Sequence, residues 1–151
     1  MSNHIKQALY QRCFEDIEQR INVIEETLAS IRESRNNETK SSAGDKYETG
    51  RAMMQIEEDK NRSQLAQAFE VKNELQKLDI DKKTIRVENG SLVYTSNGVY
   101  FISIGIGKVK LEDQLYYCVS RFSPIGMKLI GKRTGDEIEF NGNQIRIVKI
   151  A

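Results

Sequence analysis

Apolar residues recur along the first part of the chain at steps that alternate between four and three residues. They are Tyr10, Phe14, Ile17, Ile21, Ile24, Leu28 and Ile31. This is the spacing of the a and d positions of a coiled coil, and it is sustained for three heptads. Because so narrow an apolar stripe cannot bury itself, the pattern predicts a helix that packs against one partner helix.

A second, patchier stripe follows a stretch that favours a turn. Residues 32–45, RESRNNETKSSAGD, lose the seam and are rich in Asn, Ser and Gly. Helical periodicity resumes with Ala52, Ile56, Leu65, Phe69, Leu75 and Leu78, and is interrupted by Asp59, Arg62 and Ser63. Two helices of similar length around one break predict an antiparallel hairpin about 50 Å long. The alternative is a coiled coil between chains; the central break and the matched arms favour the hairpin.

After residue 80 the hydrophobic period changes to two. The runs rich in β-branched and aromatic residues are IRVE, SLVYT, VYFISIGI, LYYCVSRF, EIEF and QIRIVKI. Asn-Gly pairs at 89–90, 97–98 and 141–142 predict tight turns between strands. Ser123 and Pro124 predict the start of a short helix that ends at Gly131. We therefore expect five or six antiparallel strands with one short helix.

The predicted fold class is α+β, with a long antiparallel coiled-coil hairpin followed by a small antiparallel β-rich domain. The expected domains are residues 1–80 and residues 81–151.

Formal net charge is +1, so the overall charge does not indicate a class of binding partner. The first part holds 12 basic and 15 acidic residues and the second 11 and 7, so the two parts differ in sign. This split suggests two units with different tasks, although a solvated surface also explains it.

Several classes of protein are disfavoured by what the sequence lacks. There is no long apolar run for a membrane span, and the first residues lack the apolar core of a secretory signal. Cys13 and Cys118 lie in different predicted domains without metal-ligand spacing, so we expect reduced, buried or half-buried thiols of a cytoplasmic protein rather than a disulfide or zinc site. The glycines of ISIGIGKVK do not form a nucleotide-binding loop; Gly105 and Gly107 fit a kinked or bulged strand.

Two carboxylates, Asp45 and Glu48, occur at the predicted bend of the hairpin in the stretch AGDKYETG. One interpretation is purely structural, with Asp45 as the N-cap of the second helix and Glu48 reaching back as in a capping box. The other is functional, because a stiff hairpin with acids at its end can deliver them into a deep, narrow site. Mg²⁺ is usually held by one or two carboxylates with waters and substrate phosphates. Such a pair therefore suits a donor of catalytic groups to another protein rather than a complete enzyme.

At these residues the sequence resembles the Gre family of bacterial transcript-cleavage factors. One block is Gly44-Asp45-Lys46-Tyr47-Glu48 with the charged helix after it, which is similar to the family's tip, usually Gly-Asp-Leu-Ser-Glu-Asn. The more specific block is SPIGMKLIGKRTGDEIEF, residues 123–140, which is similar to the signature of the family's FKBP-like C-terminal domain. The order of the two predicted domains also agrees.

The resemblance implies a function in transcription. The hairpin would enter the secondary channel of bacterial RNA polymerase, and the second domain would dock outside near the channel entrance. Asp45 and Glu48 would help to hold a catalytic Mg²⁺ in the polymerase active site, with no cofactor stably bound by the chain. Cleavage of the backtracked RNA 3′ end would follow. The chain would thus be a monomeric factor that stimulates the nuclease activity of the polymerase, and not itself an enzyme.

Two alternatives stay open. Lys46, Tyr47 and Thr49 replace the family's usual Leu, Ser and Asn. Because some relatives occupy the channel and inhibit or modulate the polymerase, these departures make a non-cleaving channel regulator the first alternative. The second is a coiled-coil adaptor with a β-rich interaction domain and no role at the polymerase.

Basic residues around the predicted short helix are candidates for partner binding. Lys128, Lys132 and Arg133 would contact polymerase or nucleic acid, while a solvated helix end is the simpler interpretation. Arg51 and Arg62 are expected to form surface pairs at i,i+4 spacing. The FKBP-like resemblance does not imply prolyl isomerase activity, since no aromatic-lined pocket can be assembled from a chain without Trp.

Overall fold

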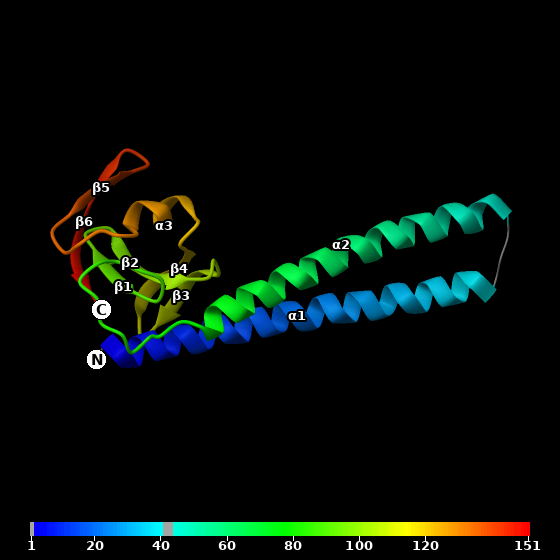
Figure 1. Ribbon diagram of the computed structural model, residues 1–151, viewed down its shortest axis with the longest axis horizontal. Coiled ribbons are helices and arrows are strands. Elements are labelled where there is room, and N and C mark those ends of the chain that lie inside the picture. Colours follow the sequence, from blue (N-terminus) through cyan, green and yellow to red (C-terminus); the bar gives the residue numbers. More distant parts are fainter. Residues whose placement is uncertain (1, 41–43) are drawn as a thin grey trace. The chain divides into compact units, whose positions relative to one another are not determined.

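The computed structural model describes residues 2–40 and 44–151, with side chains from 3–37 and 48–151 (Figure 1). It begins with two long helices, α1 (Ser2–Lys40) and α2 (Gly44–Gln76). The chain falls into two compact units, one of residues 17–73 and one of residues 1–16 together with 74–151. The division into domains at residue 80 stays a prediction.

Within the unit of residues 17–73 the two helices form the predicted antiparallel hairpin. Arg35 of α1 pairs with Glu58 of α2, whereas Glu18, near the start of the unit, lies beside Lys72, near its end. The α1 seam is confirmed, because its members in this unit are buried except for the half-buried Ile31: Ile17, Ile21, Ile24 and Leu28.

The seam of α2 differs from the predicted stripe. Ala52, Ile56 and Phe69 are exposed, so this part of the prediction was wrong. From Met54 onward, and apart from the half-buried Val71, the buried and half-buried positions repeat in steps of four and three: Met54, Glu58, Asn61, Leu65, Ala68, Lys72 and Leu75. This is an a/d seam in another phase. Apolar residues alone do not reveal it, because three of its seven positions are polar.

Helix α1 also continues through residues 32–40, where the sequence suggested a turn. The segment contains no Gly or Pro, and Asn or Ser in a helix costs only tenths of a kcal/mol relative to most residues, about 0.5 kcal/mol each relative to Ala. Arg35 continues the α1 seam four residues after Ile31 and pairs with α2. Tertiary contact therefore outweighs the local preference for a turn.

The second part of the chain forms one six-stranded sheet in the order β3-β4-β2-β1-β6-β5. The strands are β1 (Leu92–Thr95), β2 (Gly98–Ser103), β3 (Gly107–Leu111), β4 (Gln114–Ser120), β5 (Glu137–Phe140) and β6 (Asn143–Ile150). Neighbours are antiparallel except β2 and β4, which are parallel. The α+β fold class is confirmed, with this one parallel pair added.

Two predicted strands are different in the structure. The run 85–88 is not a strand: only Arg86 forms an isolated bridge, and Ile85 is 76% exposed. The run VYFISIGI does not continue to residue 106, since β2 ends at Ser103 and β3 begins at Gly107. Both strands pair with β4, from opposite sides, so the chain must cross from one side of β4 to the other between them.

The Asn-Gly pairs mark turns, but only two of them join strands of a hairpin. Asn141 and Gly142 both have positive φ, 51° and 80°, which is the backbone of a type I′ turn between β5 and β6. Between β1 and β2 the turn residues are Ser96 and Asn97, and the following glycine opens β2. The pair at 89–90 lies in a turn before β1, where Ser91 N–H donates to Glu88 C=O at 3.0 Å.

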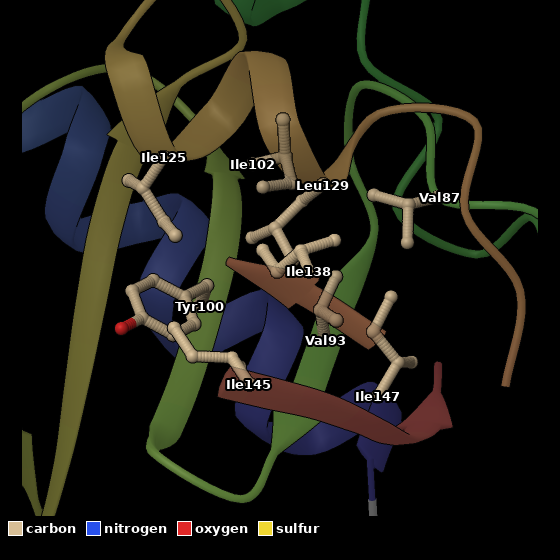
Figure 2. Packing of buried hydrophobic residues seen from close by; sticks show 9 residues of the cluster. All are labelled: Val87, Val93, Tyr100, Ile102, Ile125, Leu129, Ile138, Ile145 and Ile147. Atoms are coloured by element: carbon tan, nitrogen blue, oxygen red, sulfur yellow. The ribbon is translucent and has the colours of Figure 1, made fainter. Parts of the chain in front are cut away.

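The short helix α3 (Pro124–Leu129) begins where the sequence predicted and ends two residues before the predicted Gly131, with Ile130 as its C-cap. Ser123 is its N-cap and accepts a hydrogen bond from the Gly126 N–H at 3.1 Å. Figure 2 shows Ile125 and Leu129 of α3 packed with side chains of the strands. The cluster consists of Val87, Val93, Tyr100, Ile102, Ile125, Leu129, Ile138, Ile145 and Ile147. It is the core on one face of the sheet.

The other face of the sheet bears the residues that alternate with this core. On β2 they are Val99, Phe101 and Ser103, all buried. The first turns of α1 are held here, since Cys13 Sγ lies 3.5 Å from Ser103 Oγ. Tyr10 also donates a hydrogen bond to the carbonyl of Leu75 at 2.8 Å, which ties the start of α1 to the end of α2.

Candidate functional site

The two candidate carboxylates lie at the beginning of α2, next to the point where α1 ends. The helix begins at Gly44, so the backbone of Asp45 is already helical, and it does not occupy the predicted N-cap position before the helix. A separation of three residues places Asp45 and Glu48 on the same side of a helix. The Glu48 side chain is exposed. The side chains of Asp45, Lys46 and Tyr47 lie outside the described residues.

A buried charge network closes the hairpin about 15 Å along α2 from Glu48. Glu58 is 1% exposed and accepts hydrogen bonds from Arg35 Nη1 at 2.6 Å and Arg62 Nη2 at 2.9 Å. Arg32 Nε lies 3.5 Å from the same carboxylate. Burial by itself would raise the pKa of Glu58, but the positive charges of Arg35 and Arg62 lower it below its usual value.

Glu58 was not among the predicted site residues, because the helical stripe was predicted from apolar residues only. The pair at i,i+4 expected for Arg62 is confirmed, and its partner is this buried carboxylate. A heptad search that allowed polar residues at the seam would have found it. The network has a positional role, since it joins α1 to α2 within three turns of Glu48.

The three basic candidates of the second part are accessible to a partner. Lys128, in the last turn of α3, and Lys132 and Arg133, which follow it, are all exposed. The loop that bears them is fixed through its backbone: the Lys132 carbonyl accepts from the Val87 N–H, and the Arg133 N–H donates to Asp136. Exposed apolar side chains lie nearby in the sequence, with Phe122 72% and Met127 62% exposed. The backbone that bears Lys132 and Arg133 is thus held by hydrogen bonds while both side chains stay exposed.

A solvent-open hollow of about 440 Å³ lies between the two helices of the hairpin. Its lining is mainly apolar, with two methionines and two isoleucines beside short hydroxyl side chains: Thr27, Ser30, Ile31, Ser34, Met53, Met54, Ile56 and Glu57. Met53 and Ile56 are 65% and 68% exposed. The hairpin therefore offers apolar contact area on the same helix as Glu48.

Within the described part of the chain, no group of three or more His, Cys, Asp or Glu residues could hold a metal ion. None of the described helices is both long enough and apolar enough to cross a membrane. Both cysteines are buried, as predicted, and Cys13 belongs to the same compact unit as Cys118.

Comparison with models of protein families gives no match, and comparison with curated protein sequences gives none either. Among solved structures, a structural neighbour is the transcription factor Gfh1, a Gre-family factor. It has 18% sequence identity and a TM-score of 0.35, and the match covers 91% of this chain and 92% of that one. At this identity and TM-score the likeness does not carry a function from one protein to the other.

Proposed function

We propose that this protein is a transcription elongation factor that binds bacterial RNA polymerase through its secondary channel and stimulates cleavage of backtracked RNA. The observation that carries the proposal is the position of Asp45 and Glu48 at the start of α2, with Glu48 exposed, in a stretch that resembles the Gre tip. The factor would act in the cytoplasm, on the polymerase and indirectly on the RNA 3′ end.

The length and narrowness of the hairpin support the proposal that it enters a narrow channel. From Ile17 to Lys40, α1 rises by about 35 Å. Two packed helices are about 20 Å across, since each helix with its side chains is about 10 Å wide. The buried seam and the Glu58 network make this arm stiff, because the hairpin opens only if that carboxylate loses its arginine partners.

Two carboxylates, those of Asp45 and Glu48, suit a magnesium ion that is shared with the polymerase better than one bound by this chain alone. Two carboxylates at i,i+3 supply oxygen ligands and negative charge, and Mg²⁺ bound in this way usually keeps waters and substrate phosphates as its other ligands. When bound, the ion stabilises charge and activates water for phosphodiester hydrolysis. Asp45 and Glu48 would complete such a site only together with polymerase residues. We therefore infer that the chain is not an enzyme by itself.

The basic loop is proposed as a second contact. Lys128 is exposed at the end of α3, and Lys132 and Arg133 are exposed on the loop after it, whose backbone is held by hydrogen bonds. They can therefore meet an acidic surface with little loss of backbone entropy. We propose that they help to dock the second part of the chain on the outside of the polymerase.

The test is a cleavage assay on a purified backtracked complex. Asp45→Ala and Glu48→Ala should each reduce stimulated cleavage by about tenfold or more, because each removes an oxygen ligand of the shared ion. Binding to polymerase should persist in both variants. Glu70→Ala is the matched control, because Glu70 is an exposed glutamate about 33 Å further along α2. Full cleavage by both tip variants would contradict the proposal.

A non-cleaving regulator of the same channel is the second candidate. It is favoured by Lys46 and Tyr47, which stand between the two acids: a lysine there lowers the local negative potential, and a tyrosine is bulkier than the usual serine. In that case wild-type protein binds polymerase and alters RNA synthesis without accelerating cleavage. The Lys46→Leu, Tyr47→Ser double variant would then gain cleavage activity.

A further inference from the structure

The fold brings the two cysteines together. Cys13 lies on α1 and Cys118 on β4, and both belong to the compact unit of residues 1–16 and 74–151. They are 0% and 1% exposed, and both are free thiols. Free cysteine packs as a small apolar residue, so burial by itself does not require a thiol at either position.

Strand register places both thiols on one face of the sheet. Cys13 Sγ lies 3.5 Å from Ser103 Oγ of β2. In the parallel β2–β4 pair, Phe101 lies opposite Cys118 and Ser103 lies opposite Ser120. Because paired residues project to the same face and faces alternate along a strand, Cys118 projects to the face that carries Ser103. Cys13, which lies against Ser103, is therefore buried on the same face of the sheet as Cys118, and each thiol influences the pKa of the other.

The two thiols are not equivalent. Interactions with Cys118 and Ser103 lower the Cys13 pKa against the effect of burial. The same contact with Cys13, together with burial, raises the pKa of Cys118. Since the thiolate is the reactive form, the lowered pKa favours Cys13 as the first thiol to react, and the products are the same if Cys118 reacts first.

We propose that Cys13 and Cys118 form an oxidisable pair, which a peroxide converts into a disulfide that joins α1 to β4. The Cys13 thiolate attacks one peroxide oxygen, the O–O bond breaks, and Cys13 becomes a sulfenic acid. The released hydroxide takes up the proton that Cys13 lost and forms water. Cys118 sulfur then attacks the sulfenic sulfur, the S–O bond breaks, and the Cys118 proton leaves with the oxygen as a second water. The two thiols lose two electrons to the peroxide.

Burial determines when this chemistry occurs. A thiol inside the fold is reached only when the first turns of α1 open from the sheet, so oxidation is slow in the resting protein. Once formed, the disulfide closes a loop of about 100 residues, which constrains the unfolded chain strongly. It also prevents residues 2–16 from opening. The pair is thus a covalent lock on the start of α1 that responds to oxidant. It does not depend on the proposed function at the polymerase.

The direct test is a peptide map of the full-length wild-type chain. Reduced protein is treated with hydrogen peroxide, blocked with an alkylating agent under denaturing conditions, and digested with trypsin. Cleavage after Arg12, Arg20, Lys110 and Arg121 leaves Cys13 in residues 13–20 and Cys118 in residues 111–121. We expect these two peptides joined by a disulfide. Two alkylated cysteines, cysteines carrying added oxygen without a link, or disulfides between chains would each overturn the proposal.

Stability and hydrogen exchange give an independent readout. The oxidised wild type should melt at least about 5 °C higher than the reduced protein, and amides of residues 2–16 should exchange more slowly. Both changes should be reversed by a thiol reductant, which does not repair the oxidised methionines that peroxide also produces. Cys118→Ser should show neither change. If that variant fails to fold, the melting temperature of oxidised wild type is compared with that of the same sample after reduction. Equal melting temperatures would contradict the proposed disulfide.

Discussion

At the scale of single residues, the hairpin depends on one carboxylate buried in its seam. Glu58 occupies a seam position where an apolar residue would pack more simply, and three arginines surround it. Replacing a buried charge network by apolar residues is often neutral or stabilising, so stability alone does not explain it. The register of the two helices explains why Glu58 is there, because shifting α1 by one heptad along α2 would leave Glu58 buried without Arg35. We infer that Glu58 fixes which residues of the two helices meet.

This position makes stability depend on pH in a definite direction. Because the folded pKa of Glu58 is below its usual value of 4.5, its stabilising effect is complete above that value and is lost as pH falls through the lower folded pKa. Urea unfolding of wild type should therefore show a midpoint that drops steeply between about pH 5 and pH 3. Glu58→Gln should be less stable than wild type at pH 7 and should lose less stability on acidification.

Glu57→Gln is the control for this experiment, because Glu57 is the exposed neighbour of Glu58. It should follow the wild-type curve. An equally steep acid dependence in Glu58→Gln would show that other groups cause it.

At the scale of elements, α3 is positioned by a glycine that has no room for a side chain. A Cβ added at Gly126 would lie 2.0 Å from the carbonyl oxygen of Ser120. That carbonyl cannot move away freely, since it accepts hydrogen bonds from the Ser123 hydroxyl at 2.6 Å and the Ser123 N–H at 3.0 Å. Close approach of the helix to the end of β4 places Ile125 and Leu129 in the core (Figure 2). The glycine of the Ser-Pro-Ile-Gly block thus has a packing role.

Gly126→Ala should consequently destabilise the protein by about 2 kcal/mol or more, as overpacked cores do. Gly105→Ala provides the comparison, since a Cβ there meets no atom within 4 Å and its φ is not positive. In denaturant titrations, the midpoint of unfolding should be clearly lower for Gly126→Ala than for Gly105→Ala. Similar midpoints for both would mean that the end of β4 yields to the added methyl group.

At the scale of the whole molecule, the a/d seam is filled within one chain. Seam residues of α1 are buried against α2 in the unit of residues 17–73, and polar seam residues of α2 find partners on α1, as Lys72 does with Glu18 at 3.9 Å. A coiled-coil adaptor that pairs with a second copy would need this seam to be open. The hairpin therefore removes the main reason to dimerise.

Light scattering should accordingly give the mass of one chain, 17.3 kDa, at every concentration measured. A mass of two chains would favour the adaptor with intermolecular helices. Asn61→Leu offers a further check. A polar residue at a seam position fixes the partner and the register at a cost in stability, so its replacement by leucine should make the variant more stable than wild type or cause it to associate.

Local signals in the sequence were sufficient for several elements. The α1 seam, the Asn141-Gly142 turn and the Ser-Pro start of α3 each depend on residues within one element, so periodicity and turn chemistry predict them. The candidate site was found in the same way, from two acids near a break and a block that resembles a family. The strand at 85–88 and the continuation of β2 to residue 106 were wrong, because alternation of residue types does not say which partner strand is present.

The remaining features are properties of contacts between residues far apart in the chain. Polar residues interrupt the apolar pattern of the α2 seam. Glu58 can be buried there only because Arg32 and Arg35 of the other helix pair with it. Cys13 and Cys118 meet because α1 packs on the face of β4 that carries the second thiol. Hydrophobic periodicity along the chain shows which face of a helix or strand is buried. It does not show which polar or reactive groups of other segments lie against that face, because packing between distant segments decides this.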